Sequence, residues 1–249
     1  MYQEPYSNHN RRTADITWRS FASGARASKQ LQSALDQVLP EFFGYYAASI
    51  GPLSETLHFN QSPVKHWFKV SCRHHKWVDG VSKYDALPFA SDSLDIVLLP
   101  HILDFIQQPH DLLREVERVI IPEGKVIISG LNPYSWYGVR HLGGRFARQK
   151  SPVKRLIGLS RLKDWIKLIG FEVEDYIGLE FAGQQSPQLW HPLASHFSSH
   201  YLLVAKKKVS TPTPIRPSWR NNKKLVPARF AEPSVRNLVE RELKKVQDY

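Results

Sequence analysis

A glycine turn behind a short apolar run is the first feature of this sequence that suits a small-molecule site. The run Phe42 to Ile50 ends at Gly51-Pro52, and Ser54 and Glu55 behind it suit the first turn of a helix. A strand that turns on a glycine into a helix start is where doubly wound α/β folds hold a nucleotide-like ligand, because the free N–H groups favour an anion. The segment therefore predicts a ligand crevice.

Polar residues also follow the next apolar runs. His101 comes directly after Pro100 at the end of the run Leu94 to Leu99, and its imidazole is a candidate acid or base. A lone histidine at a strand end can equally be a structural hydrogen-bonding group, and both interpretations stay open. After the following apolar run, the segment "GLNPYSWYG" offers amide and aromatic side chains for an acceptor pocket, or for loop packing: Asn132, Tyr134, Trp136 and Tyr137.

Other site chemistries find no pattern in the sequence. There is no His-Glu-x-x-His zinc motif, no phosphate-binding P-loop and no Gly-x-Ser-x-Gly nucleophile elbow. Cys72 is the single cysteine, which excludes an intrachain disulfide and a cysteine-rich zinc site. No apolar run is long enough to span a membrane and the N-terminus lacks the apolar core of a signal peptide, so we expect a cytoplasmic protein.

The elements that position these residues follow from hydrophobic periodicity. Helices are predicted from about residue 26 to the stop at Pro40, from Pro109 to about 120, and from Ser160 to Gly170; strands are predicted at 42–50, 64–71, 94–99, 125–129, 171–179 and 200–208. The order strand, helix, strand predicts a right-handed parallel crossover, and the last two strands an antiparallel pair at the edge. The fold class is therefore α/β, with a Rossmann-like, mostly parallel sheet of the seven-stranded type flanked by helices and an antiparallel edge strand.

Charge divides the chain unevenly. The formal net charge is +11; residues 206–249 hold 12 Lys/Arg and 4 Asp/Glu, or +8, whereas residues 1–205 hold 22 and 19, or +3. We expect an irregular lead at 1–25, one α/β domain at 26–206 with a basic insertion at about 134–158, and a basic, largely disordered tail at 207–249 with a marginal helix at "VRNLVERELKKV". The insertion and tail are candidates for contact with nucleic acid, anionic lipid or another acidic partner, or are merely solubilising.

The block from Tyr84 to Pro133 resembles the second half of class I S-adenosylmethionine-dependent methyltransferases, and specifically the type 11 methyltransferase domain. The resemblance rests on residues that occur in the family's order: Asp85, Ala86, Leu87, Pro88, Phe89, Asp95, His101, Leu113, Arg114, Glu115, Arg118, Pro122 and Gly124. With the strands on either side, it extends from about residue 40 to 206.

This resemblance implies S-adenosylmethionine as cofactor and an unidentified methyl acceptor. In the family, the residue that matches Asp85 accepts a hydrogen bond from the adenine amine, the backbone at Ala86 frames the ring and Leu87 contacts it. Pro100 ends the strand beneath the sulfonium region, with His101 next to it. The first cofactor loop aligns on Gly51, with Leu53 and Ser54 beside it.

The first half of the family pattern is altered. The family motif runs acid-x-Gly-x-Gly-x-Gly, whereas this chain has Ser49, Gly51, Leu53 and Glu55 at those four places. No acidic residue ends the second strand, and Asp79 is the nearest candidate. The sequence thus supports two hypotheses: a methyltransferase with a glycine-poor first loop, or a catalytically inactive protein of that fold which binds nucleic acid or another acidic partner.

Overall fold

The computed structural model describes residues 16–20, 24–74, 76–135, 153–179, 198–209 and 235–247 of the chain. These residues divide into two units, Met1–Val209 and Ser210–Tyr249. The first unit contains a seven-stranded sheet, and the second contains the helix α8 (Val235–Gln247). The predicted helix near the C-terminus is thus confirmed.

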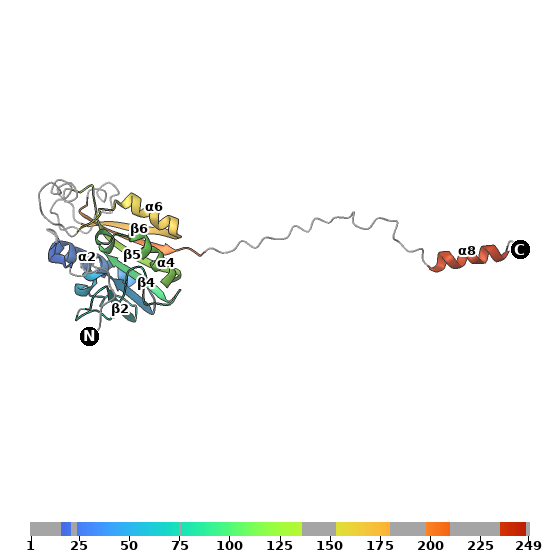
Figure 1. Cartoon of the computed structure of the whole chain (residues 1–249), viewed down its shortest axis with the longest axis horizontal. Helices are drawn as coiled ribbons and strands as arrows, with labels where there is room; N and C mark the ends of the chain where they lie inside the picture. The colour runs from blue at the N-terminus through green and yellow to red at the C-terminus, as the bar shows by residue number, and fades with distance from the viewer. Residues whose placement is uncertain are drawn as a thin grey trace. The chain divides into compact units, whose positions relative to one another are not determined.

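The sheet has the strand order β3-β2-β1-β4-β5-β7-β6 (Figure 1). Five strands run parallel: β1 (Tyr46–Ile50), β2 (His66–Ser71), β3 (Gly80–Val81), β4 (Leu94–Pro100) and β5 (Ile120–Leu131). β7 (His200–Lys207) is antiparallel to β5 and to the edge strand β6 (Phe171–Leu179). The predicted fold class and antiparallel pair are confirmed.

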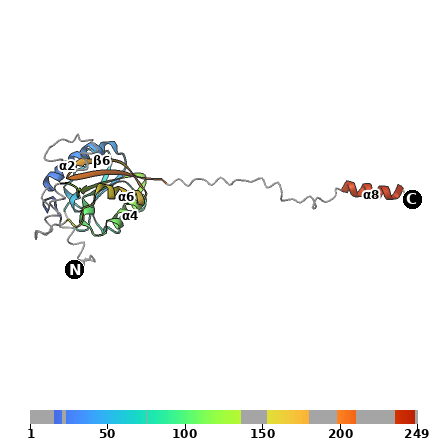
Figure 2. The same cartoon turned by 90° about the horizontal axis from the view of Figure 1, so that it is seen from above.

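Helices cover both faces of this sheet because its central strands are apolar on both sides. In β4, Ile96 and Leu98 pack toward α2 (Gly24–Val38), whereas Val97 and Leu99 pack toward α4 (Pro109–Val119) and α6 (Leu159–Ile169). Figure 2 shows α2 across the sheet from the pair α4 and α6. Successive side chains of a strand point to opposite faces, and a continuous apolar run is therefore required here.

The remaining elements are short. One-turn 3-10 helices lie at Trp18–Ser20 (η1), Leu39–Glu41 (η2) and Pro52–Thr56 (η3), and α3 spans Ile102–Phe105. η1 falls within the N-terminal stretch that we predicted to be irregular. Its Trp18 is buried because the large apolar ring packs in the cluster that includes the residues of α2. Among the described residues, β2 follows η3 and β3 follows β2 without an intervening α-helix.

The first strand is shorter than predicted. β1 begins at Tyr46 rather than at Phe42, which follows η2 directly. One carboxylate oxygen of Asp95 accepts hydrogen bonds from the N–H groups of Tyr45 and Tyr46, each at 2.9 Å. This side chain from β4 therefore fixes the point at which β1 joins the sheet.

Candidate active site

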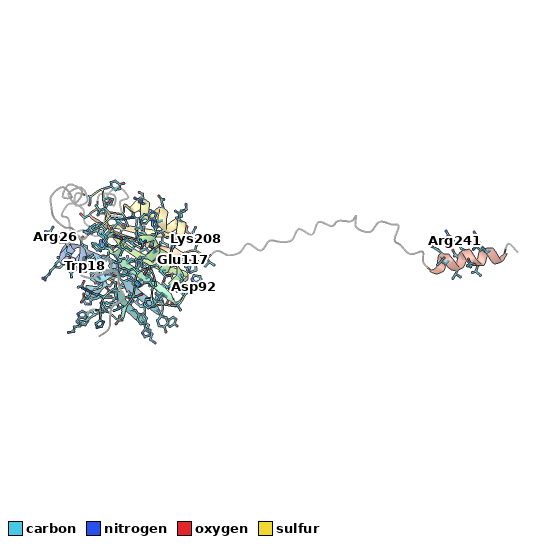
Figure 3. The ribbon with its side chains drawn as sticks, viewed as in Figure 1. Trp18, Arg26, Asp92, Glu117, Lys208 and Arg241 are labelled. Carbon is cyan, nitrogen blue, oxygen red and sulfur yellow. The ribbon has the colours of Figure 1, made fainter. Side chains whose placement is uncertain are left out.

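The residues predicted to form a site gather at the carboxyl edge of the sheet. Gly51 follows β1, Asp85 follows β3, His101 follows β4 and Asn132 follows β5. These four strands are parallel, so their carboxyl ends meet at one edge. Trp18 lies at this end of the domain, away from Asp92 and Glu117 (Figure 3).

Gly51 has a backbone conformation that an L-residue rarely adopts, with φ at 124° and ψ at 167°. Its N–H donates to the carbonyl of Val70 on β2 at 2.8 Å. A Cβ atom at this position would lie 3.1 Å from Cβ of Ile102. Glycine is needed here for both reasons, and the chain behind it forms the 3-10 helix η3 rather than the longer helix that we predicted.

Leu53 and Ser54 in η3 face the protein interior. The Leu53 side chain is 1% exposed in the apolar cluster beneath α2, and its carbonyl accepts a hydrogen bond from the indole Nε1 of Trp18 at 3.2 Å. Ser49, at the place of the family's acidic residue, donates its hydroxyl to Ser54 Oγ at 2.7 Å, and both are buried. A neutral hydroxyl pair avoids the cost of burying a carboxylate at this point.

The loop after β3 presents Asp85 and Ala86 at the surface. The hydroxyl of Ser82 donates to the carbonyl of Ala86 at 2.5 Å, and Lys83 forms a β-bridge with Ala86. The side chain of Leu87 packs in the core at 5% exposure. Asp85 is therefore an exposed carboxylate on a loop that is held on both sides.

Asp79, the nearest acidic candidate at the end of the second strand, has a structural partner. Its Oδ2 accepts a hydrogen bond from the N–H of Lys69 at 2.7 Å, and its own N–H donates to the Lys69 carbonyl at 2.9 Å. These bonds tie the loop before β3 back onto β2. The Asp79 carboxylate thus serves as hydrogen-bond acceptor for a backbone N–H group of β2.

His101 forms the sharp turn after Pro100 at the end of β4. Its φ of 50° is left-handed, its N–H donates to the carbonyl and to Oγ of Ser129, each at 3.1 Å, and its ring is fully buried. The ring lies 5.6 Å from that of Trp18 and 5.2 Å from that of His200 between centroids. Burial lowers the pKa of His101 to about 3, so the imidazole is neutral at physiological pH.

Asp104 lies in α3, three residues after His101, and is a buried carboxyl that was not predicted from the sequence. Its Oδ2 accepts a hydrogen bond from Leu131 N–H at 2.9 Å, and its carbonyl accepts from the N–H groups of Lys154 and Arg155 at 2.9 and 3.2 Å. Burial raises its pKa well above the usual value. An aspartate inside the apolar stretch "ILDFI" was the available signal. It joins α3, β5 and the segment before α6.

His200 and Tyr201 were also missed. Burial lowers the pKa of His200, with neighbouring His101 as a further cause, and raises that of Tyr201. The Tyr201 hydroxyl donates to the Ile157 carbonyl at 3.0 Å. Both begin β7, whose antiparallel course brings its first residues to the carboxyl edge opposite Leu131. Sequence spacing alone does not show this proximity.

The predicted acceptor segment and basic insertion are described only in part. Asn132 is buried and its Oδ1 accepts a hydrogen bond from Tyr134 N–H at 3.1 Å, while the Tyr134 side chain is exposed. Lys163 lies 3.5 Å from the ring centroid of Tyr176, and burial lowers its pKa. Two aromatic residues of the acceptor segment and four basic residues of the insertion lie outside the described ranges: Trp136, Tyr137, Arg140, Arg145, Arg148 and Lys150. Contact of this region and the tail with nucleic acid stays a prediction.

Among the residues that the structure describes, no group of three or more His, Cys, Asp or Glu side chains is arranged to hold a metal ion. No described helix is long and apolar enough to cross a membrane.

The chain is similar in sequence to known proteins. The family model described as "Methyltransferase domain" matches residues 62–128. The chain is 34% identical over 156 residues to the uncharacterized protein YafS of Escherichia coli, covering 63% of this chain and 65% of YafS. It is 26% identical over 112 residues to a ubiquinone biosynthesis O-methyltransferase of Pseudomonas entomophila, covering 43% and 44%. The chain thus spans less than two thirds of the length of either relative.

A solved structure extends the likeness to the fold. An S-adenosylmethionine-dependent methyltransferase from Archaeoglobus fulgidus superposes with a TM-score of 0.53 at 16% identity, covering 72% of this chain and 94% of that one. At this identity the likeness concerns the fold alone. Together with the family match, it confirms the resemblance to class I methyltransferases of type 11 on which the site residues were predicted.

Proposed function

We propose that this chain, whose residues 62–128 match a methyltransferase domain within a class I methyltransferase fold, transfers a methyl group from S-adenosylmethionine to an acceptor. The observation that carries the proposal is Gly51. Its φ of 124° gives the chain a glycine turn at the end of β1, on the same sheet edge as the Asp85 loop, which supports a cofactor loop there although the other two glycines are replaced.

The packing of the side chains around this turn supports the proposal. Leu53 replaces a glycine, but its side chain is buried in the core beneath α2. Ser54 is turned inward on Ser49. Glu55 is half-buried, and its backbone carbonyl accepts a hydrogen bond from the Lys69 ammonium at 3.1 Å. The Leu53 and Ser54 side chains are thus buried in the protein and leave the outer side of the turn free.

In the proposed site, Gly51 and the backbone of η3 would hold the amino-acid part of the cofactor, and Asp85 and Ala86 would hold its adenine. S-adenosylmethionine supplies an electrophilic methyl group on a sulfonium. The chain contributes binding and alignment, which can supply roughly 7–11 kcal/mol of a barrier when reactants are well oriented. His101, fully buried after β4 and held neutral by that burial, is assigned no proton transfer.

Calorimetric titration with S-adenosylmethionine and with its demethylated product tests this proposal. We expect dissociation constants in the micromolar range for the wild type, and a loss of at least about tenfold in Asp85→Ala, because a hydrogen bond to a charged group contributes about 1.5–3 kcal/mol. Asp164→Ala is the matched control, since Asp164 is an exposed carboxylate on α6. Absence of binding by the wild type at millimolar cofactor would overturn the proposal.

A further inference from the structure

The family motif on α4 contains an arginine whose hydrogen-bonding capacity is fully used. A guanidinium has five N–H donors, and Arg118 makes five hydrogen bonds. Two go to the carboxylate of Glu115, at 3.0 and 2.8 Å. Three go to the loop after β3: to the carbonyls of Leu87 and Phe89, at 3.3 and 3.0 Å, and to Ser91 Oγ at 3.3 Å.

Glu115 completes the contact from the other direction. Its Oε2 accepts a hydrogen bond from the N–H of Leu87 at 2.9 Å, in addition to the bond from Arg118. Hydrogen bonding from Arg118 is the main reason that the pKa of Glu115 lies below its usual value, so Glu115 is ionised. One ion pair on α4 therefore holds both the N–H and the carbonyl of Leu87.

These bonds determine where Asp85 and Ala86 stand. Ala86 is fixed on its amino side by its own N–H, which donates to the Lys83 carbonyl at 3.4 Å. On its carboxyl side it is fixed by Ser82, whose hydroxyl donates to the Ala86 carbonyl, and by the bonds to Leu87. Asp85 itself is exposed. The exposed carboxylate thus depends on a loop that α4 holds at Leu87, Phe89 and Ser91.

We infer that Glu115 and Arg118 are positioning residues for adenine recognition: the pair fixes the loop that presents Asp85 and Ala86 to the cofactor. The inference rests on the proposed function. The positioning role also requires an arginine at residue 118. A lysine has three donors on a single nitrogen and cannot reach two carbonyls, a hydroxyl and a carboxylate together.

Four variants of the full chain test the inference: Arg118→Lys, Glu115→Gln, Asp85→Ala and the double variant Asp85→Ala/Arg118→Lys. The matched control is Arg114→Lys, one turn earlier on α4, where the side chain is 76% exposed and lies 4.0 Å from Asp111. Two measurements are made: the dissociation constant of S-adenosylhomocysteine by calorimetry, and amide hydrogen exchange of residues 84–91. Thermal unfolding of each variant monitors the overall fold.

We expect Arg118→Lys and Glu115→Gln to weaken binding by about tenfold and to speed exchange at residues 84–91, as loss of a supporting shell typically does. Arg114→Lys should stay within about twofold of wild type, as is usual for a weak surface pair. In the Asp85→Ala background the effect of Arg118→Lys should shrink to less than about threefold, because the two changes act on the same contact. A purely structural pair would not show this coupling.

The outcomes separate the two proposals. A wild type that binds no cofactor overturns the proposed function, and the adenine role of the pair with it. If the wild type binds, two results overturn the positioning role alone. One is that Arg118→Lys binds S-adenosylhomocysteine as tightly as Arg114→Lys does. The other is that the losses of affinity in Asp85→Ala and Arg118→Lys are additive in the double variant. If Arg118→Lys does not fold, Glu115→Gln gives the same readouts.

Discussion

Replacing Gly51 by alanine measures how closely α3 packs over the turn after β1. The φ of 124° and ψ of 167° lie in a region that is open essentially to glycine alone, which costs another residue about 1–3 kcal/mol. The new Cβ would also meet Cβ of Ile102 at 3.1 Å in a fully buried place, and such overpacking costs about 1–3 kcal/mol more. We expect Gly51→Ala to lower the free energy of unfolding by about 3 kcal/mol.

Two other glycines separate these contributions. Gly170, which ends α6 with φ at 104°, has nothing within 4 Å of the position of a Cβ, so Gly170→Ala should cost only the conformational part, about 1 kcal/mol. At Gly80 the nearest atom is Val70 Cγ2 at 3.8 Å, and Gly80→Ala should change stability by less than about 0.5 kcal/mol. Urea unfolding of the three variants gives the series. Equal losses in Gly51→Ala and Gly170→Ala would refute the close contact with Ile102.

Two further changes test polar groups of the sheet. The pKa of His101 is about 3 in the folded chain and ordinarily 6.5, so between these pH values the unfolded chain binds a proton that the folded chain excludes. When the pH is lowered from 8 to 5, the free energy of unfolding of the wild type should therefore fall by about 2 kcal/mol more than that of His101→Gln. Equal falls in urea titrations would contradict this. Asp95→Ala removes the acceptor of two N–H groups at the start of β1 and should cost about 1–3 kcal/mol, with Asp164→Ala as control; a change below about 0.5 kcal/mol would show that water replaces it.

Hydrophobic periodicity was sufficient for the central sheet and its three long helices. A strand that is buried on both faces needs a continuous apolar run, as in β4, whereas a helix that is buried on one face repeats its apolar residues every three or four positions, as in α4. The two patterns therefore identify the two kinds of element. The strand end at Gly51 was also predictable, since glycine before proline is a strong turn signal.

Residues brought together from distant parts of the chain could not be predicted in the same way. Trp18 meets the carbonyl of Leu53, 35 residues away, and His200 meets the ring of His101. Neither pair has a fixed spacing, because each depends on which strands become neighbours. The motif residues Glu115 and Arg118 were visible in the sequence, but their role requires knowing that α4 packs beside the loop after β3.

The last strand ends in a firmly anchored lysine, and this affects how the protein can be engineered. The Lys207 ammonium donates to Asp92 Oδ1 at 2.9 Å and to the carbonyls of Glu117 and Ile120 at 2.7 and 2.9 Å. All three partners belong to the unit that ends at Val209. A stop codon or a fused tag placed after Val209 therefore removes none of these bonds. The boundary lets the basic tail be deleted or exchanged as a module while the sheet keeps its final strand.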